Sequence, residues 1–298
     1  MDMLTLSHVK KRFGKKEVLQ DVSFSVPENT VFGFVGQNGA GKTTAMKLIL
    51  GLLSCDEGRI TVNGSAVRYG NTHTNRFIGY LPDVPEFYSY MTPAEYLAFC
   101  GEITGMPKPE TKKRAAELLA LVGLEQERRR IKGFSRGMKQ RLGVAQALMN
   151  RPRLLICDEP TSALDPAGRK ELLDILVAVK KETTVLFSTH ILSDVEHICD
   201  ELAFLHEGRI ALKGTLEEVR KIRRTAAVEL EMEHARDAGL LLRECPFLQR
   251  LGHNVLLLRE PEHLPEVLGR IAEKRLSVLR VERMEPALED LFMEVVGK

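Results

Sequence analysis

The sequence predicts an α/β protein built around a largely parallel sheet and followed by a small α+β unit. Three observations support this prediction. A glycine-rich loop lies between a short apolar run, residues 30–35, and a helical pattern, which gives the order strand, loop, helix. Apolar runs then alternate with helical patterns over residues 154–199, which is typical of parallel strands covered by helices. Beyond residue 224 strands and helices begin again on a smaller scale.

Short strands are predicted for the N-terminal part of the chain. Apolar and polar residues alternate over residues 4–6 and 18–26, as in half-buried strands. Residues 59–67 contain Asn63-Gly64, a pair that favours a tight hairpin. The helix after the glycine-rich loop is indicated by apolar residues spaced i, i+3, i+4 and i+7: Ala45, Leu48, Ile49 and Leu52.

The middle of the chain is predicted to be helical. Thr92, Pro93 and Glu95 form a capping box with proline at the first helical position, which opens the first of three helices. The next two are predicted over residues 111–122 and 137–150. Together these helices form a helical subdomain, which we place at about residues 84–150.

The remaining elements divide into two domains. The first domain continues with strand 154–157, helix 166–181, strand 184–188, helix 191–199, hairpin 202–213 around Glu207-Gly208, and helix 216–222. The second contains strand 226–232, helix 235–244, strand 254–258, helix 262–274, strand 278–283 and a last helix from Pro286, with an apolar stripe of Leu288, Leu291, Phe292, Val295 and Val296. Residues 220–224 are a basic candidate linker. We therefore predict domains of residues 1–222 and 225–298.

The composition is that of a globular protein. The 298 residues are 44% hydrophobic and 28% charged, with a formal net charge of +2, which gives no indication of nucleic-acid binding. No apolar run reaches the roughly 18–20 residues needed to cross a bilayer, and the first residues lack a secretory signal. The five cysteines are scattered and form no CxxC pair, so we expect them to be reduced and mostly buried. These features predict a cytoplasmic location.

The glycine-rich loop matches the phosphate-binding pattern GxxxxGK[ST]. Its residues are Gly36, Gln37, Asn38, Gly39, Ala40, Gly41, Lys42 and Thr43, followed by Thr44. The glycines let backbone N–H groups converge on phosphate oxygens, and the helix that follows adds the positive end of its dipole. Lys42 is expected to reach the β- and γ-phosphates, and Thr43 to bind Mg²⁺.

A phosphate-binding loop needs an acidic partner at the end of a buried strand. The apolar residues 154–157 are followed by Asp158 and Glu159. We predict that Asp158 is the partner for Mg²⁺. Glu159 would orient or deprotonate the water that attacks the nucleotide.

Several motifs together resemble the ATP-binding cassette (ABC) family, specifically the ATPase subunit of an ABC transporter. Residues 134–141 look like the signature sequence, usually LSGGQ. Residues 162–165 look like the D-loop, and residues 188–190 like the switch histidine. The resemblance covers about residues 1–220. It implies a P-loop NTPase (RecA-like) core with an antiparallel β-subdomain and a helical subdomain.

The resemblance also implies a site shared between two chains. Ser135 and Gly137, at the start of a helix, would contact the γ-phosphate of ATP held by the partner. Asp165 would lie at the dimer interface, and His190 would hydrogen-bond the γ-phosphate and help position the water. The implied ligands are ATP and Mg²⁺. The implied partner ATPase is an identical chain or a paralogous subunit.

Three positions need separate interpretation. Phe13 stands where the family places an adenine-stacking aromatic residue, and the alternative is a core phenylalanine. Arg136 replaces the first glycine of the signature, and Asp83 replaces the family's usual glutamine. Asp83 is shorter and anionic, and we expect it to approach Mg²⁺ or water with a different reach. Both departures resemble those of drug-, lantibiotic- and ABC-2-type export ATPases, which favours export over import.

A transport ATPase without membrane spans needs a multi-span permease subunit, which would hold it at the inner face of the cell membrane. Aromatic residues after Asp83 are predicted to contact that subunit, or else to cover the chain's own helical subdomain; these are Phe87, Tyr88 and Tyr90, with Pro85 beside them. The basic residues 128–130 face lipid phosphates or simply solvent. In the accessory domain His234, His253 and His263 show no ligand-like grouping and are interpreted as surface residues.

Three functions remain open from the sequence. The first is an ATPase that closes as a dimer around two ATP and drives a membrane subunit, with export as the expected direction. The second is a soluble ABC ATPase that acts on a ribosome or a DNA complex. The usual marks of these proteins, a second cassette or a long coiled-coil insertion, are not seen in the sequence. The third is a binding or regulatory module, against which the intact Lys42, Asp158, Glu159 and His190 argue.

Overall fold

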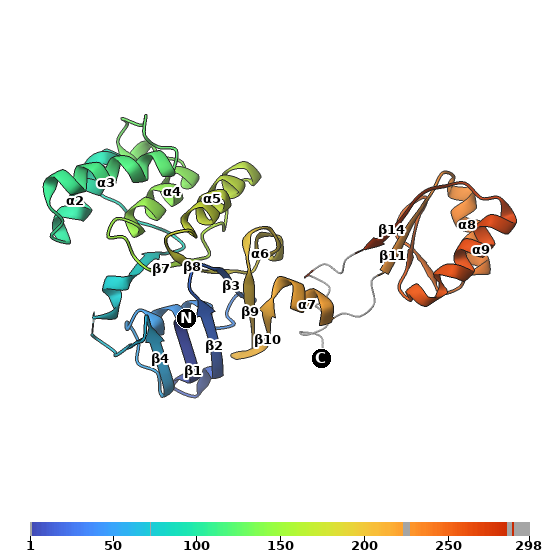
Figure 1. Cartoon of the computed structure of the whole chain (residues 1–298), viewed down its shortest axis with the longest axis horizontal. Coiled ribbons are helices and arrows are strands. Elements are labelled where there is room, and N and C mark those ends of the chain that lie inside the picture. Colours follow the sequence, from blue (N-terminus) through green and yellow to red (C-terminus); the bar gives the residue numbers. More distant parts are fainter. Residues whose placement is uncertain (1, 72, 223–226, 285–287, 289–298) are drawn as a thin grey trace. The chain divides into compact units, whose positions relative to one another are not determined.

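The structure is a computed structural model that describes residues 2–71, 73–222, 227–284 and 288. The chain divides into two compact units, Met1–Leu216 and Glu217–Lys298 (Figure 1). The division falls at the start of α7 (Leu216–Ile222), a few residues before the boundary predicted at 222–225. Among the described residues, no helix is both long enough and apolar enough to cross a membrane.

The N-terminal unit contains an antiparallel sheet of order β2-β1-β4-β5. Its strands are β1 (Asp2–Phe13), β2 (Lys16–Pro27), β4 (Glu57–Val62) and β5 (Ser65–Ala66). The predicted hairpin is confirmed: Asn63 and Gly64 connect β4 to β5, and both have left-handed backbone conformations. Every second residue of β2 is buried from Val22 to Val26, as the alternation of the sequence predicts.

The second sheet of this unit has the order β10-β9-β3-β8-β7-β6. Its strands are β3 (Val31–Val35), β6 (Ile78–Leu81), β7 (Leu154–Asp158), β8 (Thr184–Thr189), β9 (Glu201–His206) and β10 (Arg209–Thr215). All neighbouring pairs are parallel except the hairpin β9–β10. The strands β3, β7 and β8 are buried along their whole length, which explains the apolar runs in their sequences. Loops at the carboxyl ends of these strands carry the site.

The helices of the N-terminal unit include three that cover the parallel sheet, α1 (Lys42–Ile49), α5 (Pro166–Val179) and α6 (Leu192–Ile198). The prediction that Leu52 continues the apolar face of α1 is wrong. The helix ends at Ile49 because Gly51 adopts a left-handed conformation with φ 69°, and its N–H bonds to the carbonyl of Leu48. Leu52 lies beyond this turn and is 58% exposed.

The helical subdomain consists of α2 (Pro93–Ile103), α3 (Lys108–Leu121) and α4 (Arg136–Ala147), grouped at one side of the unit (Figure 1). The capping box of α2 is confirmed, with Thr92 and Glu95 bonding each other's backbone N–H groups. Helix α3 begins three residues before the predicted start, at Lys108. Helix α4 begins at Arg136, one residue earlier than predicted, because Ser135 accepts a hydrogen bond from the N–H of Met138 and acts as its N-cap.

The core of the N-terminal unit joins the two sheets around α1. Phe24 of β2 stacks on Phe32 and Phe34 of β3, with ring centroids 5.5 and 5.2 Å apart. Buried residues of α1, including Met46 and Ile49, belong to the same cluster. This packing holds the helix that follows the phosphate-binding loop against both sheets. All five cysteines are free, and burial raises the pKa of the Cys157 and Cys199 thiols.

The C-terminal unit has an antiparallel sheet of order β12-β13-β11-β14. Its elements are β11 (Ala227–Met232), α8 (Ala235–Glu244), β12 (Leu248–Arg250), β13 (Val255–Leu258), α9 (Leu264–Lys274) and β14 (Val278–Met284), of which β12 was not predicted. Apolar residues of β11, β13, α8 and α9 form its core. The predicted last helix lies outside the described residues except for Leu288, which is buried.

The three histidines of the C-terminal unit differ in environment. His234 and His253 are exposed, as predicted. His263 stacks on Phe247 with ring centroids 4.4 Å apart, and its side chain is 38% exposed. The structure also groups His263 with Glu260 and Glu262, so the prediction that it has no ligand-like neighbours is wrong.

Candidate functional site

The phosphate-binding loop connects the end of β3 to the start of α1. The N–H of Gly36 donates to the carbonyl of Thr189 at 3.2 Å, which ties the beginning of the loop to β8. Gly41 precedes α1 with φ 112°, a backbone conformation that residues other than glycine rarely adopt. A Cβ at this position would lie 2.8 Å from Leu19. The loop therefore leads directly into a helix whose first N–H groups are available to an anion.

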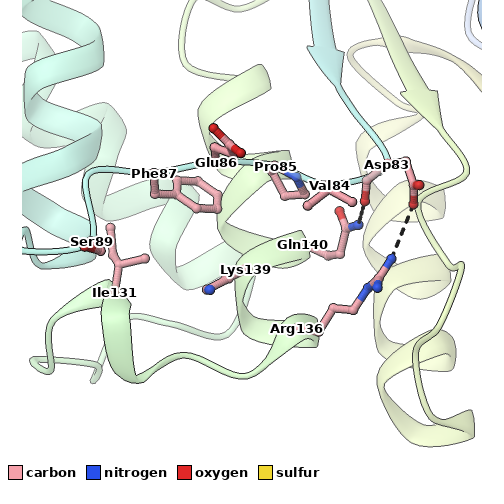
Figure 2. A pocket seen from close by; sticks show the side chains of 10 residues that line it. All are labelled: Asp83, Val84, Pro85, Glu86, Phe87, Ser89, Ile131, Arg136, Lys139 and Gln140. Atoms are coloured by element: carbon pink, nitrogen blue, oxygen red, sulfur yellow. Dashed lines mark hydrogen bonds and ion pairs between the residues drawn. The ribbon is translucent and has the colours of Figure 1, made fainter.

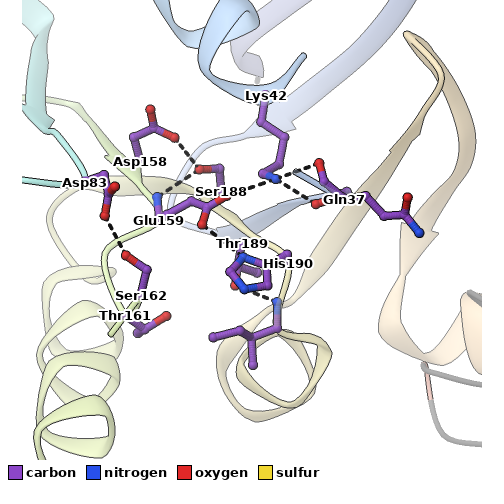
Figure 3. Close-up of polar contacts among 12 residues, drawn as sticks. Gln37, Lys42, Asp83, Asp158, Glu159, Thr161, Ser162, Ser188, Thr189 and His190 are labelled. Carbon is purple, nitrogen blue, oxygen red and sulfur yellow. Dashed lines mark hydrogen bonds and ion pairs between the residues drawn. The ribbon is translucent and has the colours of Figure 1, made fainter. Parts of the chain in front are cut away.

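Lys42 lies at the bottom of this loop and its side chain is only 4% exposed. Its ammonium donates to the carbonyls of Gly36 and Gln37, at 2.7 and 3.1 Å, and lies 3.0 Å from Oε1 of Glu159 (Figure 3). A buried cation needs such partners, since burial without them would disfavour the charged form. The ammonium is thus held between the phosphate-binding loop and the acidic end of β7.

Asp158 and Glu159 follow β7, and Ser188 of β8 holds both. Asp158 stands opposite Ser188 in the parallel register of the two strands. The Ser188 hydroxyl donates to Oδ1 of Asp158 at 2.7 Å and accepts from the N–H of Glu159 at 2.9 Å (Figure 3). Glu159 has φ 45°, which is uncommon for a residue other than glycine and is found at functional turns. The turn directs its carboxylate toward Lys42.

His190 contacts the second oxygen of the Glu159 carboxylate. Its Nδ1 lies 2.9 Å from Oε2, with the carboxylate as the acceptor (Figure 3). The imidazole is 41% exposed, whereas the Glu159 side chain is 18% exposed. The Thr189 hydroxyl, one residue earlier, accepts a hydrogen bond from the N–H of Ile191 and fixes the turn that follows β8. Glu159 therefore bridges a lysine and a histidine.

Two titratable side chains beside Asp158, those of Tyr80 and Cys157, remain neutral at physiological pH. Burial, with a contribution from Asp158, raises the pKa of Tyr80 to about 12. Burial also raises the pKa of the Cys157 thiol. The negative charge at this edge of the sheet therefore comes from the carboxylates.

A cleft of about 640 Å³ brings together most of the predicted site residues. It is lined by Phe13, Lys16, Val18, Asn38, Gly39, Gly41, Lys42, Thr43, Thr44, Asp83, Asp158 and Glu159. Phe13 is 49% exposed, so the alternative of a core phenylalanine is wrong. Its ring lies 5.5 Å from the ammonium of Lys11. The side chains that line the cleft are thus aromatic (Phe13), basic (Lys16 and Lys42) and acidic (Asp83, Asp158 and Glu159).

The oxygen donors of this cleft suit a magnesium ion. Thr43, Asp83 and Asp158 all line it, which provides a hydroxyl and two carboxylates. Mg²⁺ is typically bound by one or two carboxylates together with phosphate oxygens and water. The residues present therefore fit the predicted metal.

The predicted signature and D-loop residues lie outside the cleft. Ser135 caps α4 and is exposed, and Gly137 follows in the first turn of that helix. Asp165 is exposed and caps α5 by accepting from the N–H of Gly168 at 3.3 Å. None of these three residues lines the cavity that contains Lys42. Within one chain, the structure does not bring them to the phosphate-binding loop.

The two departures from the family pattern contact each other. Arg136 Nη2 lies 3.4 Å from Oδ1 of Asp83, and the hydroxyl of Ser162 donates to the same oxygen at 2.5 Å (Figures 2 and 3). The side-chain amide of Gln140 donates to the backbone carbonyl of Asp83 (Figure 2). A second cavity, of about 500 Å³, lies beside these residues and is also lined by Asp83.

The aromatic residues after Asp83 differ in how far they are buried. Phe87 packs edge-on against Tyr96 of α2 with ring centroids 5.1 Å apart, so it covers the helical subdomain. Tyr88 contacts Phe99 but is 50% exposed, and Tyr90 is 62% exposed. Phe87 and Pro85 line the second cavity. Tyr88 and Tyr90, which follow in the sequence, expose aromatic surface to solvent.

Several residues that organise the site were not predicted individually from the sequence. Ser188 is the most important, because it fixes the ends of Asp158 and Glu159. Its position opposite Asp158 follows from the register of β7 and β8, which the motifs alone do not define. Ser162 and Gln140, which hold Asp83, and Lys16, which lines the cleft, were also missed.

A glycine-rich loop that ends in a buried lysine, facing an aspartate–glutamate pair at the end of a parallel strand, defines a P-loop nucleotide-binding protein. Residues 19–162 match the ABC transporter family. The ABC transporter ATP-binding protein YxlF of Bacillus subtilis is 39% identical over 99% of both chains. The chain belongs to the ABC transporter family: it is the ATP-binding subunit of an ABC transporter and an ATPase.

Further relatives carry names that state a role. The linearmycin resistance ATP-binding protein LnrL of Bacillus subtilis is 33% identical over 99% of both chains. The bacitracin transport ATP-binding protein BcrA of Bacillus licheniformis is 32% identical over 99% of this chain and 97% of its own. Among solved structures, an ATP-binding subunit of an ABC transporter is 34% identical, with a TM-score of 0.65 over 74% of this chain and 92% of that chain. The cbiO1 protein of Clostridium perfringens, part of the ABC transporter complex cbiONQ, has a TM-score of 0.69 at 26% identity, over 75% and 95%.

Proposed function

We propose that this chain hydrolyses ATP to drive a separate multi-span membrane subunit that exports its substrate. The observation that carries the proposal is the position of Asp83, which lines both the nucleotide cleft and the neighbouring cavity. A change at the nucleotide can therefore reach a partner seated in that cavity through one residue. The names of LnrL and BcrA, which refer to resistance and to antibiotic transport, support export.

The residues of the cleft suggest how the chain acts on ATP. The Lys42 ammonium is placed to contact the β- and γ-phosphates, and the Phe13 ring to stack on the adenine. Glu159 is placed to take a proton from the attacking water, with His190 beside it to fix the orientation of the carboxylate. Thr43, Asp158 and Asp83 would hold Mg²⁺, which when bound neutralises phosphate charge.

We further propose that two cassettes close around two ATP. The partner cassette is an identical chain or a paralogous subunit. Ser135, Gly137 and Asp165 are exposed or half-buried and lie outside the chain's own cleft, which leaves them available to a second cassette. The first N–H groups of α4, following Ser135, offer a favourable environment for the γ-phosphate of the partner's ATP.

The cavity beside Asp83 is the proposed docking site of the membrane subunit. It lies between the loop after β6 and α4 and is lined by both apolar and charged residues, among them Pro85, Phe87, Glu86 and Lys139 (Figure 2). Protein interfaces likewise combine apolar and polar surface. Docking there would hold the protein in the cytoplasm at the inner face of the cell membrane.

Replacing Ser135 by arginine tests the shared site. We expect Ser135→Arg to lower ATP turnover by about 10²-fold, which is typical when a preorganised donor set is disrupted. The affinity of the single chain for ATP should not change, because Ser135 is outside its own cleft. Turnover by an ATPase assay and ATP affinity by calorimetry distinguish the two effects.

The matched control is Thr92→Arg, which also removes the N-cap of an exposed helix of the same subdomain. Thr92→Arg weakens the start of α2, but the rate of ATP turnover per folded molecule should stay within about twofold of the wild-type value. If Ser135→Arg were equally active, Ser135 would not belong to the site.

Capture of the membrane partner tests the transport role. Tagged Glu159→Gln protein, incubated with ATP, is used to purify complexes from detergent-solubilised native membranes, and the partners are identified by mass spectrometry. We expect a stoichiometric multi-span membrane protein, and we expect the cavity variant Lys139→Glu to lose it. Lys170→Glu, an exposed lysine of α5, serves as the control.

The outcome also decides between the proposed function and its alternative. If the tagged protein captured only ribosomes or a DNA-bound complex, the soluble ABC ATPase would replace the transporter as the explanation. If Lys139→Glu retained the membrane protein in full, the docking site would lie elsewhere.

A further inference from the structure

Two adjacent turns of α4 hold the loop that follows β6. Arg136 and Gln140 lie one turn apart on α4, and both contact Asp83, one at its carboxylate and the other at its backbone carbonyl (Figure 2). Gln140 is fully buried, and Asp83 also accepts from Ser162 at the start of the D-loop. Three separate segments of the chain therefore meet at residue 83.

The contact between Arg136 and Asp83 is electrostatic and partly open to solvent. The closest nitrogen–oxygen distance is 3.4 Å, and the side chains are 45% and 49% exposed. Arg136 Nη2 also lies 3.4 Å from the hydroxyl of Ser162, so the guanidinium faces both the carboxylate and the hydroxyl that donates to it. Within the described part of the chain, the cation that forms an ion pair with Asp83 is Arg136.

The charges around the cleft indicate what the ion pair of Arg136 and Asp83 does. Asp83 lines the same cavity as Asp158 and Glu159, and the substrate that enters it is a polyanion. Where Mg²⁺ does not neutralise it, an additional carboxylate would weaken the binding of such a substrate through repulsion between like charges. Lys42 is already engaged with Glu159, so it does not serve as the counter-ion of Asp83.

We propose that Arg136 is a positioning residue for Asp83: it neutralises that carboxylate and holds it against Ser162, and so allows an aspartate at the boundary of the nucleotide cleft. The inference rests on the proposed binding of ATP in this cleft, and it does not depend on a membrane partner. It makes positions 83 and 136 energetically dependent on each other, although 53 positions separate them in the sequence.

A double-mutant cycle tests the pair in the full-length protein. The variants are Arg136→Gly, Asp83→Gln and the double variant, which together restore the residues usual in the family. We expect Arg136→Gly alone to raise the KM for ATP about three- to tenfold, the lower part of the range for residues in contact, because the pair is half-exposed. In the Asp83→Gln background the same change should leave KM within about twofold.

Two further measurements separate positioning from folding. KM does not depend on the fraction of folded enzyme, whereas a merely structural defect lowers the measured rate. Arg136→Lys, which keeps the charge, should restore much of the affinity. Raising the salt concentration should shrink the coupling, because exposed charges are screened. The binding of MgATP, measured by calorimetry with the same four proteins, provides the coupling independently of turnover.

Glu127 and Arg129 supply a matched control. They form an ion pair at 2.7 Å in the same subdomain, with Arg129 65% exposed, and neither residue lines the nucleotide cleft. The cycle of Arg129→Gly and Glu127→Gln should show no coupling in KM.

Each result bears on the proposal. If Arg136→Gly raised KM equally in both backgrounds, or in neither, Arg136 would not act through Asp83. If Arg136→Lys behaved like Arg136→Gly, charge would not be the cause. If the wild-type protein failed to turn over ATP, the proposed function would fail, while coupling in MgATP binding would still decide the role of the pair.

Discussion

Replacing Glu159 by glutamine is expected to lower the kcat for ATP hydrolysis by about 10²- to 10⁴-fold, the usual contribution of a general base. The amide has the same shape but does not accept a proton from water. Lys42 keeps its hydrogen bonds to the carbonyls of Gly36 and Gln37, so the phosphate-binding loop retains its geometry. ATP binding should therefore persist, and the closed dimer should accumulate with MgATP.

Single-turnover kinetics and light scattering check both parts of this expectation. The control is Glu171→Gln, which removes a carboxylate of α5 that lies 3.5 Å from Arg141 and is 56% exposed. It should leave turnover unchanged. If Glu159→Gln kept more than a tenth of the wild-type rate, Glu159 would not be the general base. If only single chains were seen with MgATP and the membrane partner, the shared site would be contradicted.

Replacing Lys42 by alanine should reduce hydrolysis by at least about 10²–10³-fold, as expected on removing a preorganised donor from developing negative charge. The structure predicts that Lys42→Ala also affects Glu159 and the affinity for ATP. Glu159 loses its cation, although the contact with His190 remains. The affinity for ATP should fall as well, because the ammonium is proposed to contact the phosphates in the ground state.

Rates from an ATPase assay and affinities from calorimetry measure the two effects of Lys42→Ala. Lys47→Ala is the matched control, since Lys47 is exposed on the same helix. Lys42→Arg keeps the charge but changes its reach and geometry, and we expect it to bind ATP better than the alanine variant. Turnover near the wild-type rate in Lys42→Ala would mean that the phosphate-binding loop has been misassigned.

The phosphate-binding loop and the acidic end of β7 could be predicted from the sequence because residues close together in the chain determine their geometry. A strand, a glycine-rich loop and a helix determine where Lys42 and Thr43 lie, and a buried strand delivers Asp158 to the edge of the sheet. The capping box of α2 is another case, since its hydrogen bonds join residues three positions apart.

The errors arose where neighbours distant in sequence, or a single backbone angle, decide the structure. The i, i+7 spacing placed Leu52 on α1, but the left-handed Gly51 ends the helix first. The strand β12 has three residues, too few for an alternation to be visible, and it is stabilised by pairing with β13. The contact of Asp83 with Arg136 depends on how α4 packs beside β6, which no local pattern records.

The end of β8, together with the residue that follows it, has a thermodynamic consequence for the whole site. Ser188, Thr189 and His190 are consecutive, and they hold the end of β7, the first residue of the phosphate-binding loop and the carboxylate of Glu159. Because β8 lies inside the sheet between β3 and β7, the entropy lost in assembling these segments is lost during folding. Little ordering of these segments then remains to oppose the binding of ATP, so the site is preorganised for its ligand.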